Sequence, residues 1–491
     1  MLAYNAYARK ANRGGVRRTR SSTVRLAAAL GLVGLAVLAL GWLGGIDRYK
    51  HRLETAASDA LGMEVRIRGH VRLGLFPDLH VTVEDGEILD EQGVAVFSAK
   101  RGLLGIEPLP LLRRQLRVTR IQLTQPRLSI ERDRNGTLNV DRLERNAAEL
   151  LAALNEASVS LRDGAMGYTD RRAGTGFEAA GLNVAVSRIR VAGGNGPQPW
   201  KRLSLQAKLS CAEIRTKELS LTGLKIVVDG KDGVYEIDPV AMRLFGGEMV
   251  GSVRADLSAS VPVCQIRCAL PGFRIEEFFK TLSPTKAVEG AMDFSATLSM
   301  RGGTMSEMMR AASGDVSLHG ENLTLIGNDL DKKLSRFESS QNFNLVDVGA
   351  VFFAGPFGLG VTRGYGFGSL FRASGGSSRI RTVVSTWTVA HGVAQAKDVA
   401  MATSKNRIAL RGGLDFVSGR FADVTVAVID AKGCATVQQA IRGPFGEPEV
   451  EKPHVLRSLA GPVVRLFQKA RGLFPAGPCE VFYSGSVAPP R

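Results

Sequence analysis

The sequence predicts a mainly β protein that begins with one transmembrane helix and continues as a long antiparallel β-sheet with a few short helices. Two observations predict this fold class. Residues 26–46 form a run of 21 residues without a charged side chain. After residue 62, short runs in which apolar and polar residues alternate recur along the chain. Alternation with a period of two is typical of half-buried strands, and about 20 apolar residues are needed to span a bilayer.

The apolar run from Leu26 to Ile46 has the length and surroundings of a membrane anchor. At ~1.5 Å per residue, a helix of this length measures about 31 Å. Trp42 lies near its outer end, where an aromatic ring suits the membrane interface. Basic residues precede the run, and no acidic residue does: Arg9, Lys10, Arg13, Arg17, Arg18, Arg20 and Arg25. This asymmetry predicts a cytoplasmic N-terminus and a translocated body.

A cleaved signal peptide and a buried helix are the alternatives to this anchor. The apolar part of a signal peptide is shorter, roughly 7–15 residues, and ends at a small-residue cleavage site. The length of the run therefore favours an uncleaved anchor. The next longest uncharged runs, Val348–Thr362 and Thr382–Ala396, have 15 residues each and are too short to span a membrane.

Length and charge constrain the organisation of the rest. A chain of 491 residues is expected to form more than one domain. We expect a basic tail (1–25), the anchor (26–46), two β domains (47–235 and 236–431) and a C-terminal cap (432–491). The net charge is +17, and seven of these charges lie in the tail, which leaves +10 for the remainder. No basic stripe with interleaved aromatic residues is present, so nucleic acid is not an expected partner.

The clearest strand pattern follows a short predicted helix, Asp47–Leu61, that ends at Gly62. From Met63 to Leu75, apolar residues alternate with charged ones, and after Phe76-Pro77-Asp78 the alternation resumes. One face of this strand pair is apolar, and it either contacts lipid or packs as a closed core. The candidate lipid-facing residues are Val65, Ile67, Val71, Leu73, Leu75, Val81 and Val83.

Similar patterns predict the later elements. Helices are expected at 108–114, 139–158, 273–281, 305–312 and 453–471. Strands are expected at 94–99, 116–123, 127–132, 290–299, 314–319, 323–326, 380–390, 398–403, 407–410 and 421–429. The segment Val348–Phe371 is apolar and rich in glycine, and we expect either a buried hairpin or a membrane contact there.

The sequence contains no recognisable catalytic or metal-binding motif. The G-x-S-x-G, H-E-x-x-H and Walker patterns are absent, and the glycines of 364–368 lack the strand-to-helix setting of a dinucleotide loop. The cysteines have no zinc-site spacing. We therefore expect a protein that is not an enzyme and that has no cofactor and no metal site.

Two of the five cysteines, Cys434 and Cys479, bracket a C-terminal segment of about 45 residues. If the body lies outside the cytoplasm, a disulfide between them would close a loop, with a stabilisation of roughly 3–4 kcal/mol in the chain-entropy model. We state this pairing as a hypothesis.

Several segments together resemble the AsmA family of bacterial envelope proteins. The first is LGMEVRIRGHVRLGLFPDLHVTVEDGEI after the anchor and its short helix. The resemblance is carried by the order and number of these segments, not by one diagnostic motif. The matching segments are Leu61–Ile88, Leu109–Asn139, Leu244–Val253, Val288–Met309, Ser313–Leu330, Ala390–Thr403 and Ile429–Val450.

The resemblance implies a single-pass protein of the bacterial inner membrane whose bulk lies in the periplasm. It implies a long antiparallel sheet curled into a groove, a role in outer-membrane biogenesis, and movement of phospholipids between membranes. It brings no catalytic residues. The expected partners are membrane phospholipids and other envelope proteins. The alternative is an assembly or structural factor for outer-membrane proteins, with a closed core and no lipid cargo.

The disulfide hypothesis predicts a change in electrophoretic mobility. Replacing Cys434→Ser should slow the full chain on a non-reducing gel, because the closed loop would be opened, and should leave the reduced protein unchanged. Cys264→Ser is the control, because Cys264 has no predicted partner. Equal non-reducing mobility of the wild type and Cys434→Ser would count against the pairing.

Overall fold

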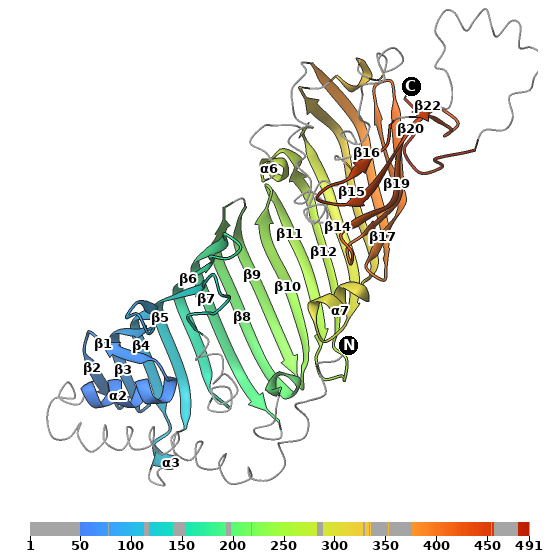
Figure 1. Ribbon diagram of the computed structural model, residues 1–491. Helices are drawn as coiled ribbons and strands as arrows, with labels where there is room; N and C mark the ends of the chain where they lie inside the picture. The colour runs from blue at the N-terminus through green and yellow to red at the C-terminus, as the bar shows by residue number, and fades with distance from the viewer. Residues whose placement is uncertain are drawn as a thin grey trace, which may run out of the picture. The chain divides into compact units, whose positions relative to one another are not determined.

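The computed structural model describes residues 50–76, 78–111, 117–140, 154–192, 198–217, 219–281, 288–327, 329–332, 334, 352, 376–452, 454–455 and 480–490. As predicted, this part of the chain is mainly antiparallel β-structure with a few short helices (Figure 1). It divides into two compact units, Met1–Ala212 and Glu213–Arg491, and the boundary falls within strand β8 (Leu203–Thr216).

The predicted anchor, including Leu26, Trp42 and Ile46, lies outside the described residues. Within the part of the chain that the structure does describe, no helix is both long and apolar enough to cross a bilayer.

Unit 1 is a sheet that starts beside a helix. β1 and β2 both pair with β3, and β3 to β7 pair in chain order; all these pairs are antiparallel except β5 and β6, which are parallel. A parallel pair needs a crossover connection, and residues 133–157 provide it. The elements are α2 (Lys50–Leu61), β1 (Glu64–Ile67), β2 (Val71–Gly74), β3 (His80–Leu89), β4 (Ala95–Ile106), α3 (Pro108–Leu111), β5 (Val118–Arg132), β6 (Ser158–Asp170), β7 (Thr175–Val191), η2 (Pro199–Arg202) and the first part of β8.

The single strand predicted from Met63 to Leu75 is two short strands that run one after the other along β3. The break is small, because the Arg68 and Gly69 N–H groups still donate to the carbonyls of Asp85 and Glu84 at 2.9 and 3.1 Å. A Cβ atom at Gly69 would lie 2.7 Å from the Glu84 carbonyl oxygen. The glycine therefore lets the two backbones approach where the strand is interrupted.

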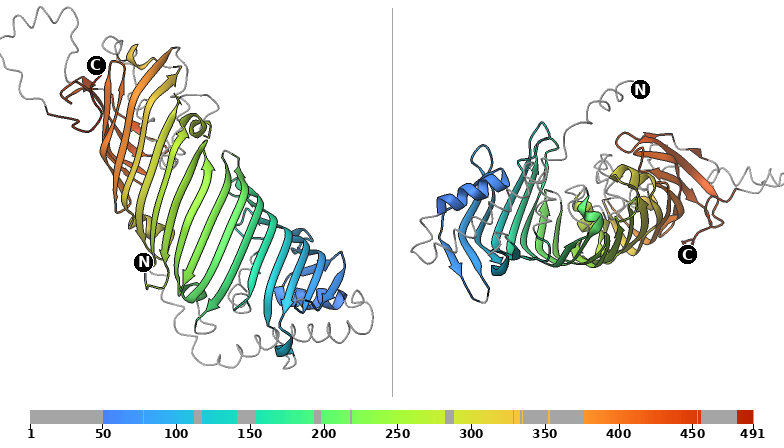
Figure 2. Two further views of the ribbon diagram at one scale, coloured as in Figure 1. Left: turned by 180° about the vertical axis from the view of Figure 1, so that it is seen from behind. Right: turned by 90° about the horizontal axis from the view of Figure 1, so that it is seen from below.

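Unit 2 continues with antiparallel strands in chain order, and Figure 2 shows its green-to-orange strands following a curved surface. Short β13 pairs with β15 beside β14, and β21 and β22 both pair with β20. The elements are β9 (Ser220–Lys231), β10 (Val234–Leu244), β11 (Gly247–Asp256), β12 (Val263–Arg274), α6 (Ile275–Lys280), β13 (Val288–Glu289), β14 (Ala291–Arg301), α7 (Met305–Arg310), β15 (Ser313–Ile326), β16 (Ser377–Ala390), β17 (Val393–Thr403), β18 (Arg407–Asp415), β19 (Arg420–Ile429), β20 (Ala435–Pro444), β21 (Glu449–Val450) and β22 (His454–Val455).

The core of unit 2 is closed by helix α6, which occupies the centre of the predicted helix 273–281. Phe278 and Phe279 of α6 are 0% and 1% exposed and pack with residues of β12 to β16. Burial by itself raises the pKa of the Glu276 carboxyl at the start of α6. Hydrogen bonds from the backbone N–H groups of Glu276 and Gly290, together with Arg274, outweigh burial and lower that pKa. The charged carboxylate thus holds the helix start against the sheet.

Two segments for which the sequence predicts a structure, both in the second half of the chain, include only a few described residues. Of the apolar segment 348–371, the structure describes Phe352, which is 1% exposed and accepts a hydrogen bond from the Ser385 hydroxyl through its carbonyl oxygen. Of the helix predicted over 453–471, residues 454–455 form β22, so the prediction is wrong at these two positions. The remainder of both segments lies outside the described residues.

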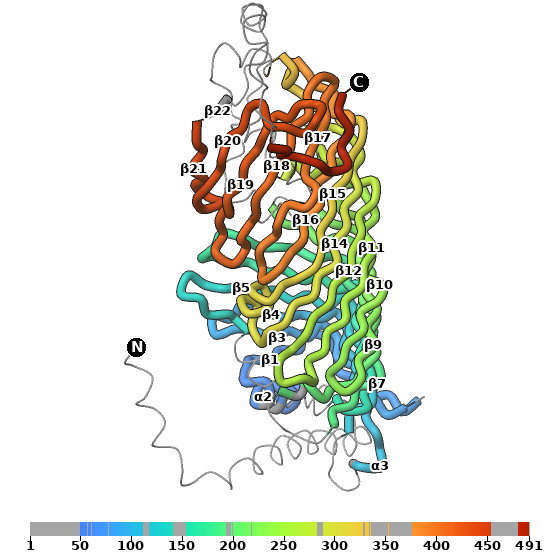
Figure 3. Tube along the Cα trace, turned by 90° about the vertical axis from the view of Figure 1, so that its right-hand side faces the viewer, coloured from blue at the N-terminus to red at the C-terminus, as the bar shows by residue number. Residues whose placement is uncertain are grey.

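The C-terminal segment 480–490 packs on β17–β19 through Phe482, Tyr483 and Val487 (Figure 3). The Phe482 and Tyr483 N–H groups donate to the Gly433 carbonyl at 2.8 and 3.0 Å. Next to this contact, Cys434 forms a β-bridge with Val481. Cys434 is disulfide-bonded, whereas Cys264 and Cys268 are free thiols. Cys479, two residues before Val481, lies outside the described residues, so its pairing with Cys434 stays a prediction.

A hydrogen-bonded Tyr–Asp pair also holds the C-terminal segment 480–490 on the sheet. The Tyr483 hydroxyl donates to Asp398 Oδ1 at 2.5 Å and accepts from the Val487 N–H at 3.0 Å. The Ser486 hydroxyl and N–H donate to the other Asp398 oxygen at 2.7 and 3.0 Å. Burial raises the pKa of Asp398, but these hydrogen bonds lower it further than burial raises it. The carboxylate therefore stays charged and holds the C-terminal segment on the sheet.

Replacing Tyr483→Phe should lower the free energy of unfolding of unit 2 by about 1.5–3 kcal/mol, because a hydrogen bond to a charged group is lost. The pKa of Asp398 is lowered in the folded state, so its contribution is present above the unfolded pKa and lost as pH falls through the folded pKa. The difference between variant and wild type should therefore shrink in acid. Thermal unfolding followed by circular dichroism from neutral to acid pH measures both effects.

Tyr168→Phe is the control, because the Tyr168 hydroxyl lies 3.4 Å from Asp170 Oδ2, a longer and weaker contact. It should change the unfolding midpoint less than Tyr483→Phe does. An equal decrease of the unfolding midpoint in the two variants would show that the hydrogen bond to Asp398 stabilises the fold no more than the longer Tyr168 contact does.

Candidate functional site

Half-buried apolar side chains form continuous rows across β3–β7 of unit 1. In each row the residues lie directly opposite one another in the strand register. None of these residues is charged, and all are half-buried. We call these two rows the apolar face of unit 1. The first row is Val81, Leu104, Ile121, Val159 and Val186, and the second is Val83, Gly102, Leu123, Leu161 and Val184.

The neighbouring row on the same strands has a different chemistry. Each of its members precedes or follows a residue of the apolar face by one position, so its side chains point to the other side of the sheet. The row is mostly polar or small: Thr82, Leu103, Gln122, Ser160 and Ala185. The sheet of unit 1 is therefore two-sided, with one apolar and one largely polar face.

The strands of unit 1 have irregular backbone positions at one level. On β5, Leu123 and Leu128 are five positions apart, which in a regular strand would place them on opposite faces. Gln125 between them has a positive φ of 50°, and its neighbour on β6, Asp163, has 54°. The β4–β5 and β5–β6 registers are the same before and after Gln125, whereas the β6–β7 register shifts between Leu161 and Gly164.

Hydrogen bonds of polar side chains connect these positions from strand to strand. The Gln125 amide donates to Asp163 Oδ2 at 3.0 Å, and the Asp163 N–H donates to Asn183 Oδ1 at 3.1 Å. Asn183 lies on β7, two positions after Gly181, whose φ is 64°. Neighbouring strands thus carry their irregularities at the same level.

In unit 2 the burial of one row increases along the sheet. This row runs through Cys268, Ala296, Val316 and Trp387 on β12, β14, β15 and β16. Cys268 is half-buried, whereas Ala296, Val316 and Trp387 are 7%, 3% and 1% exposed. On β9–β11, the apolar residues Val228, Ile237 and Val253 remain half-buried. The early strands of unit 2 thus have an accessible apolar face, and the later strands a sealed core.

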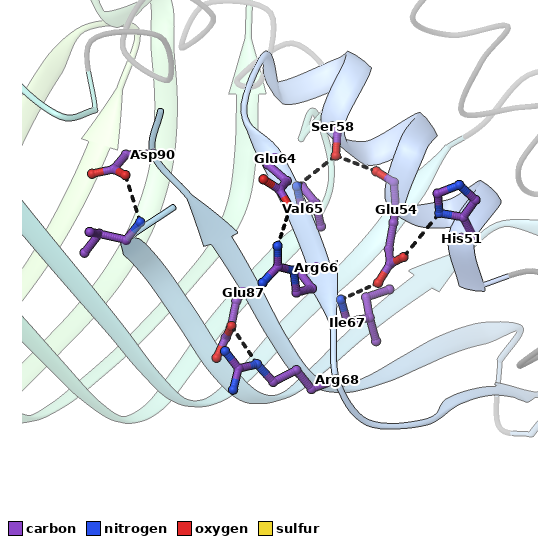
Figure 4. Close-up of polar contacts among 11 residues, drawn as sticks. His51, Glu54, Ser58, Glu64, Val65, Arg66, Ile67, Arg68, Glu87 and Asp90 are labelled. Atoms are coloured by element: carbon purple, nitrogen blue, oxygen red, sulfur yellow. Dashed lines mark hydrogen bonds and ion pairs between the residues drawn. The ribbon is translucent and has the colours of Figure 1, made fainter. Parts of the chain in front are cut away.

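At the start of unit 1, helix α2 covers the edge strand β1 (Figure 4). The Val65 N–H donates to the Ser58 hydroxyl oxygen at 2.8 Å, and the Ile67 N–H donates to Glu54 Oε1 at 2.7 Å. Both N–H groups belong to the strand edge that faces away from β3, where another chain could otherwise pair. Side chains of the helix therefore accept the hydrogen bonds that this strand edge would otherwise offer to another chain.

A scan against protein-family models matches this chain to the AsmA family over residues 19–212 and 191–352. The two matched segments overlap and together cover more than half of the 491 residues. The chain belongs to the AsmA family. No curated protein matches it significantly. The family predicted from the sequence is thus confirmed. In this AsmA-family chain, the feature that can support a function is a sheet with an apolar face.

The predicted lipid-facing residues occupy three different settings. Val83 and Val81 belong to the apolar face, and Val81 and Leu73 also pack beside Leu79 and Ile106. The remaining four differ in exposure: Val65 is half-buried, Ile67 and Val71 are 6% and 4% exposed, and Leu75 is 74% exposed beyond the end of β2.

The members of the apolar face beyond β3 are not among the residues predicted from the sequence. Alternation in Leu182–Val186 and around Val159 could have indicated these members, but their alignment with β3 depends on strand register. Among the described residues, no group of three His, Cys, Asp or Glu side chains is placed to hold a metal ion.

Removing the edge cover should open β1. Glu54→Ala leaves the Ile67 N–H without its acceptor, and a hydrogen bond to a charged group is worth about 1.5–3 kcal/mol. Amide hydrogen exchange in a peptide covering residues 63–70 should accelerate about tenfold or more, as measured by mass spectrometry.

The matched control is Glu64→Ala, which removes an ion pair with Arg66 in which both side chains are about half exposed. Exposed pairs contribute ~0–1 kcal/mol, so exchange should change little. Similar acceleration in both variants would mean that α2 is not the element that protects the edge.

Proposed function

We propose that this AsmA-family protein is anchored in the bacterial inner membrane by residues 26–46 and binds or transfers phospholipids along the apolar face of its periplasmic body. The role we propose is in outer-membrane biogenesis. The observation that carries the proposal is the pair of uncharged, half-buried rows across β3–β7.

The chemistry of these rows suits acyl chains. Each CH₂ group kept from water contributes about 0.8 kcal/mol, so a surface of Val, Leu and Ile can hold a hydrocarbon chain without any reactive group. Five strands spaced ~4.8 Å apart make a row about 19 Å long. A lipid lying across the strands would keep its chains on the apolar side and its headgroup at a polar margin. This function needs no catalytic residue and no cofactor.

The sequence and the cysteine chemistry support the proposed location. The basic residues before the apolar run favour a cytoplasmic N-terminus and a translocated body. Cys434 is disulfide-bonded, and disulfides persist in oxidising compartments such as the bacterial periplasm. Both observations fit a body on the periplasmic side of the inner membrane.

A second candidate function is a non-enzymatic assembly factor for outer-membrane proteins. The sealed core of β14–β20 favours it, because Val383, Leu414 and Val424 are 0% exposed and leave no room for cargo there. In this alternative the apolar rows serve only packing, and the envelope partners bind at the surface. The two functions differ in whether lipid contacts the apolar face of unit 1.

Photocrosslinking distinguishes these functions. With p-benzoylphenylalanine in place of Leu123 or Leu161 in the full chain, illumination in cells should yield phospholipid adducts, because both positions lie on the apolar face. Mass spectrometry of the purified protein detects and identifies the adducts. At least tenfold fewer are expected from Gln122 and Ser160, which neighbour these residues in sequence, are also half-buried and lie on the opposite face.

Phospholipid that co-purifies with the protein provides an independent measurement. Leu161→Glu should reduce it severalfold, because a carboxylate would be placed among acyl chains, whereas Ser160→Glu should not. Absence of adducts from both faces, with no co-purifying phospholipid, would refute lipid binding and favour the assembly factor.

A further inference from the structure

Three exposed apolar side chains lie at the same end of the strands of unit 1. Phe76, Leu75 and Leu109 are 87%, 74% and 72% exposed, which makes them the three most exposed large apolar residues in the part of the chain that the structure describes. Single exposed apolar residues are common on protein surfaces, but the gathering of the three most extreme cases at one place is not. We call Leu75, Phe76 and Leu109 the apolar tip.

The strand topology brings these residues together. Leu75 and Phe76 lie between the end of β2 and the start of β3, and β4 runs antiparallel to β3, so it ends beside that turn. Leu109 follows in α3, directly after β4. The Ile106 N–H donates to the Leu79 carbonyl at 2.8 Å, which joins the two connections.

Charged side chains fix the base of the tip while its apolar residues stay exposed. Arg120 at the start of β5 pairs with Asp78 at 2.7 Å, and Asp78 follows the exposed pair by two positions. Arg117 pairs with Glu107 at 3.3 Å on either side of α3. These contacts hold both connections to the sheet, so Phe76 and Leu109 project from a fixed base.

The start of α2 points to the same end of the sheet. Glu54 contacts Ile67, and Ser58, one turn later, contacts Val65, so the helix runs opposite to β1. Because β2 continues β1 along β3, the end where β2 finishes is also the end toward which Lys50 points. Only three residues separate Lys50 from Ile46, the last residue of the proposed anchor.

The first turn of α2 carries charges that suit an anionic surface. Lys50 and Arg52 lie in this turn, and no acidic residue does. Cations are disfavoured at a helix N-terminus by the helix dipole, and nearby anionic lipid headgroups would offset this. The His51 side chain is 92% exposed.

We propose that the apolar tip inserts into the periplasmic leaflet of the membrane that holds the anchor, with the first turn of α2 at the level of the anionic headgroups. This inference rests on the proposed anchorage. The apolar row that begins at Val81 and Leu104 starts next to the tip, since His80 pairs with Gly105. Insertion therefore places the first row of the apolar face at the bilayer surface, where a phospholipid leaving the membrane would enter.

The test uses the full chain in vesicles of phosphatidylethanolamine and phosphatidylglycerol. With p-benzoylphenylalanine at position 76 or 109, illumination should give phospholipid adducts at least tenfold more often than at position 94. Val94 is 59% exposed in the β3–β4 turn, at the opposite end of the same strands, which makes it a matched control. In the Leu75→Ser, Phe76→Ser double variant, lipid adducts from position 109 should fall severalfold, because the tip would leave the bilayer.

The outcomes separate this inference from the proposed lipid binding. Adducts from 76 and 109 but none from 161 would support the tip and refute cargo on the apolar face. Lipid adducts from 161 with none from 76 and 109, or equal yields from 76, 109 and 94, would overturn the tip. Protein adducts in place of lipid at 76 and 109, in cells, would also overturn it and assign this surface to an envelope protein.

Discussion

Interstrand hydrogen bonding sets the constraint on which the rest of this structure depends. A strand that pairs on both sides has its register fixed by both neighbours, and a slip of one residue would move all its side chains to the other face. In unit 1 Gln125 and Asp163, both with positive φ, are joined by a side-chain hydrogen bond, and the Asp163 N–H donates to Asn183 Oδ1. The apolar face lies on one side of these positions, where its two rows keep one register across β3–β7.

The elements that pack over an apolar row determine whether the row is closed core or accessible surface. In unit 2 the row from Cys268 to Trp387 changes from half-buried to sealed, because α6 and the later strands pack over it. In unit 1 the rows across β3–β7 stay half-buried. The same alternation therefore produces a core in one place and an accessible surface in another, and only the accessible surface suits the lipid function that we propose.

Strand edges in the described part of the chain are covered by different elements. The edge of β1 is satisfied by the side chains of Ser58 and Glu54. Short β21 and β22 pair with parts of β20. Exposed strand edges invite pairing with other chains, so these covers protect an extended sheet from aggregation. The apolar tip stays exposed where β2 and β4 end in unit 1.

The sequence by itself determined the mainly β class, the AsmA family, the end of the first helix at Gly62, and the presence of α6 and α7 within a few residues. These features depend on local periodicity, on turn and capping residues, and on ordered similarity along the chain. Tertiary structure decided that 63–75 splits into β1 and β2, and that the predicted strands 116–123 and 127–132 join as β5. It also decided that Leu75 lies at an exposed tip, and that Val83 shares a row with Leu161 although no local pattern links them. A period of two shows that a strand has an apolar face, but register and covering elements come from distant residues, and these determine whether that face is core or surface.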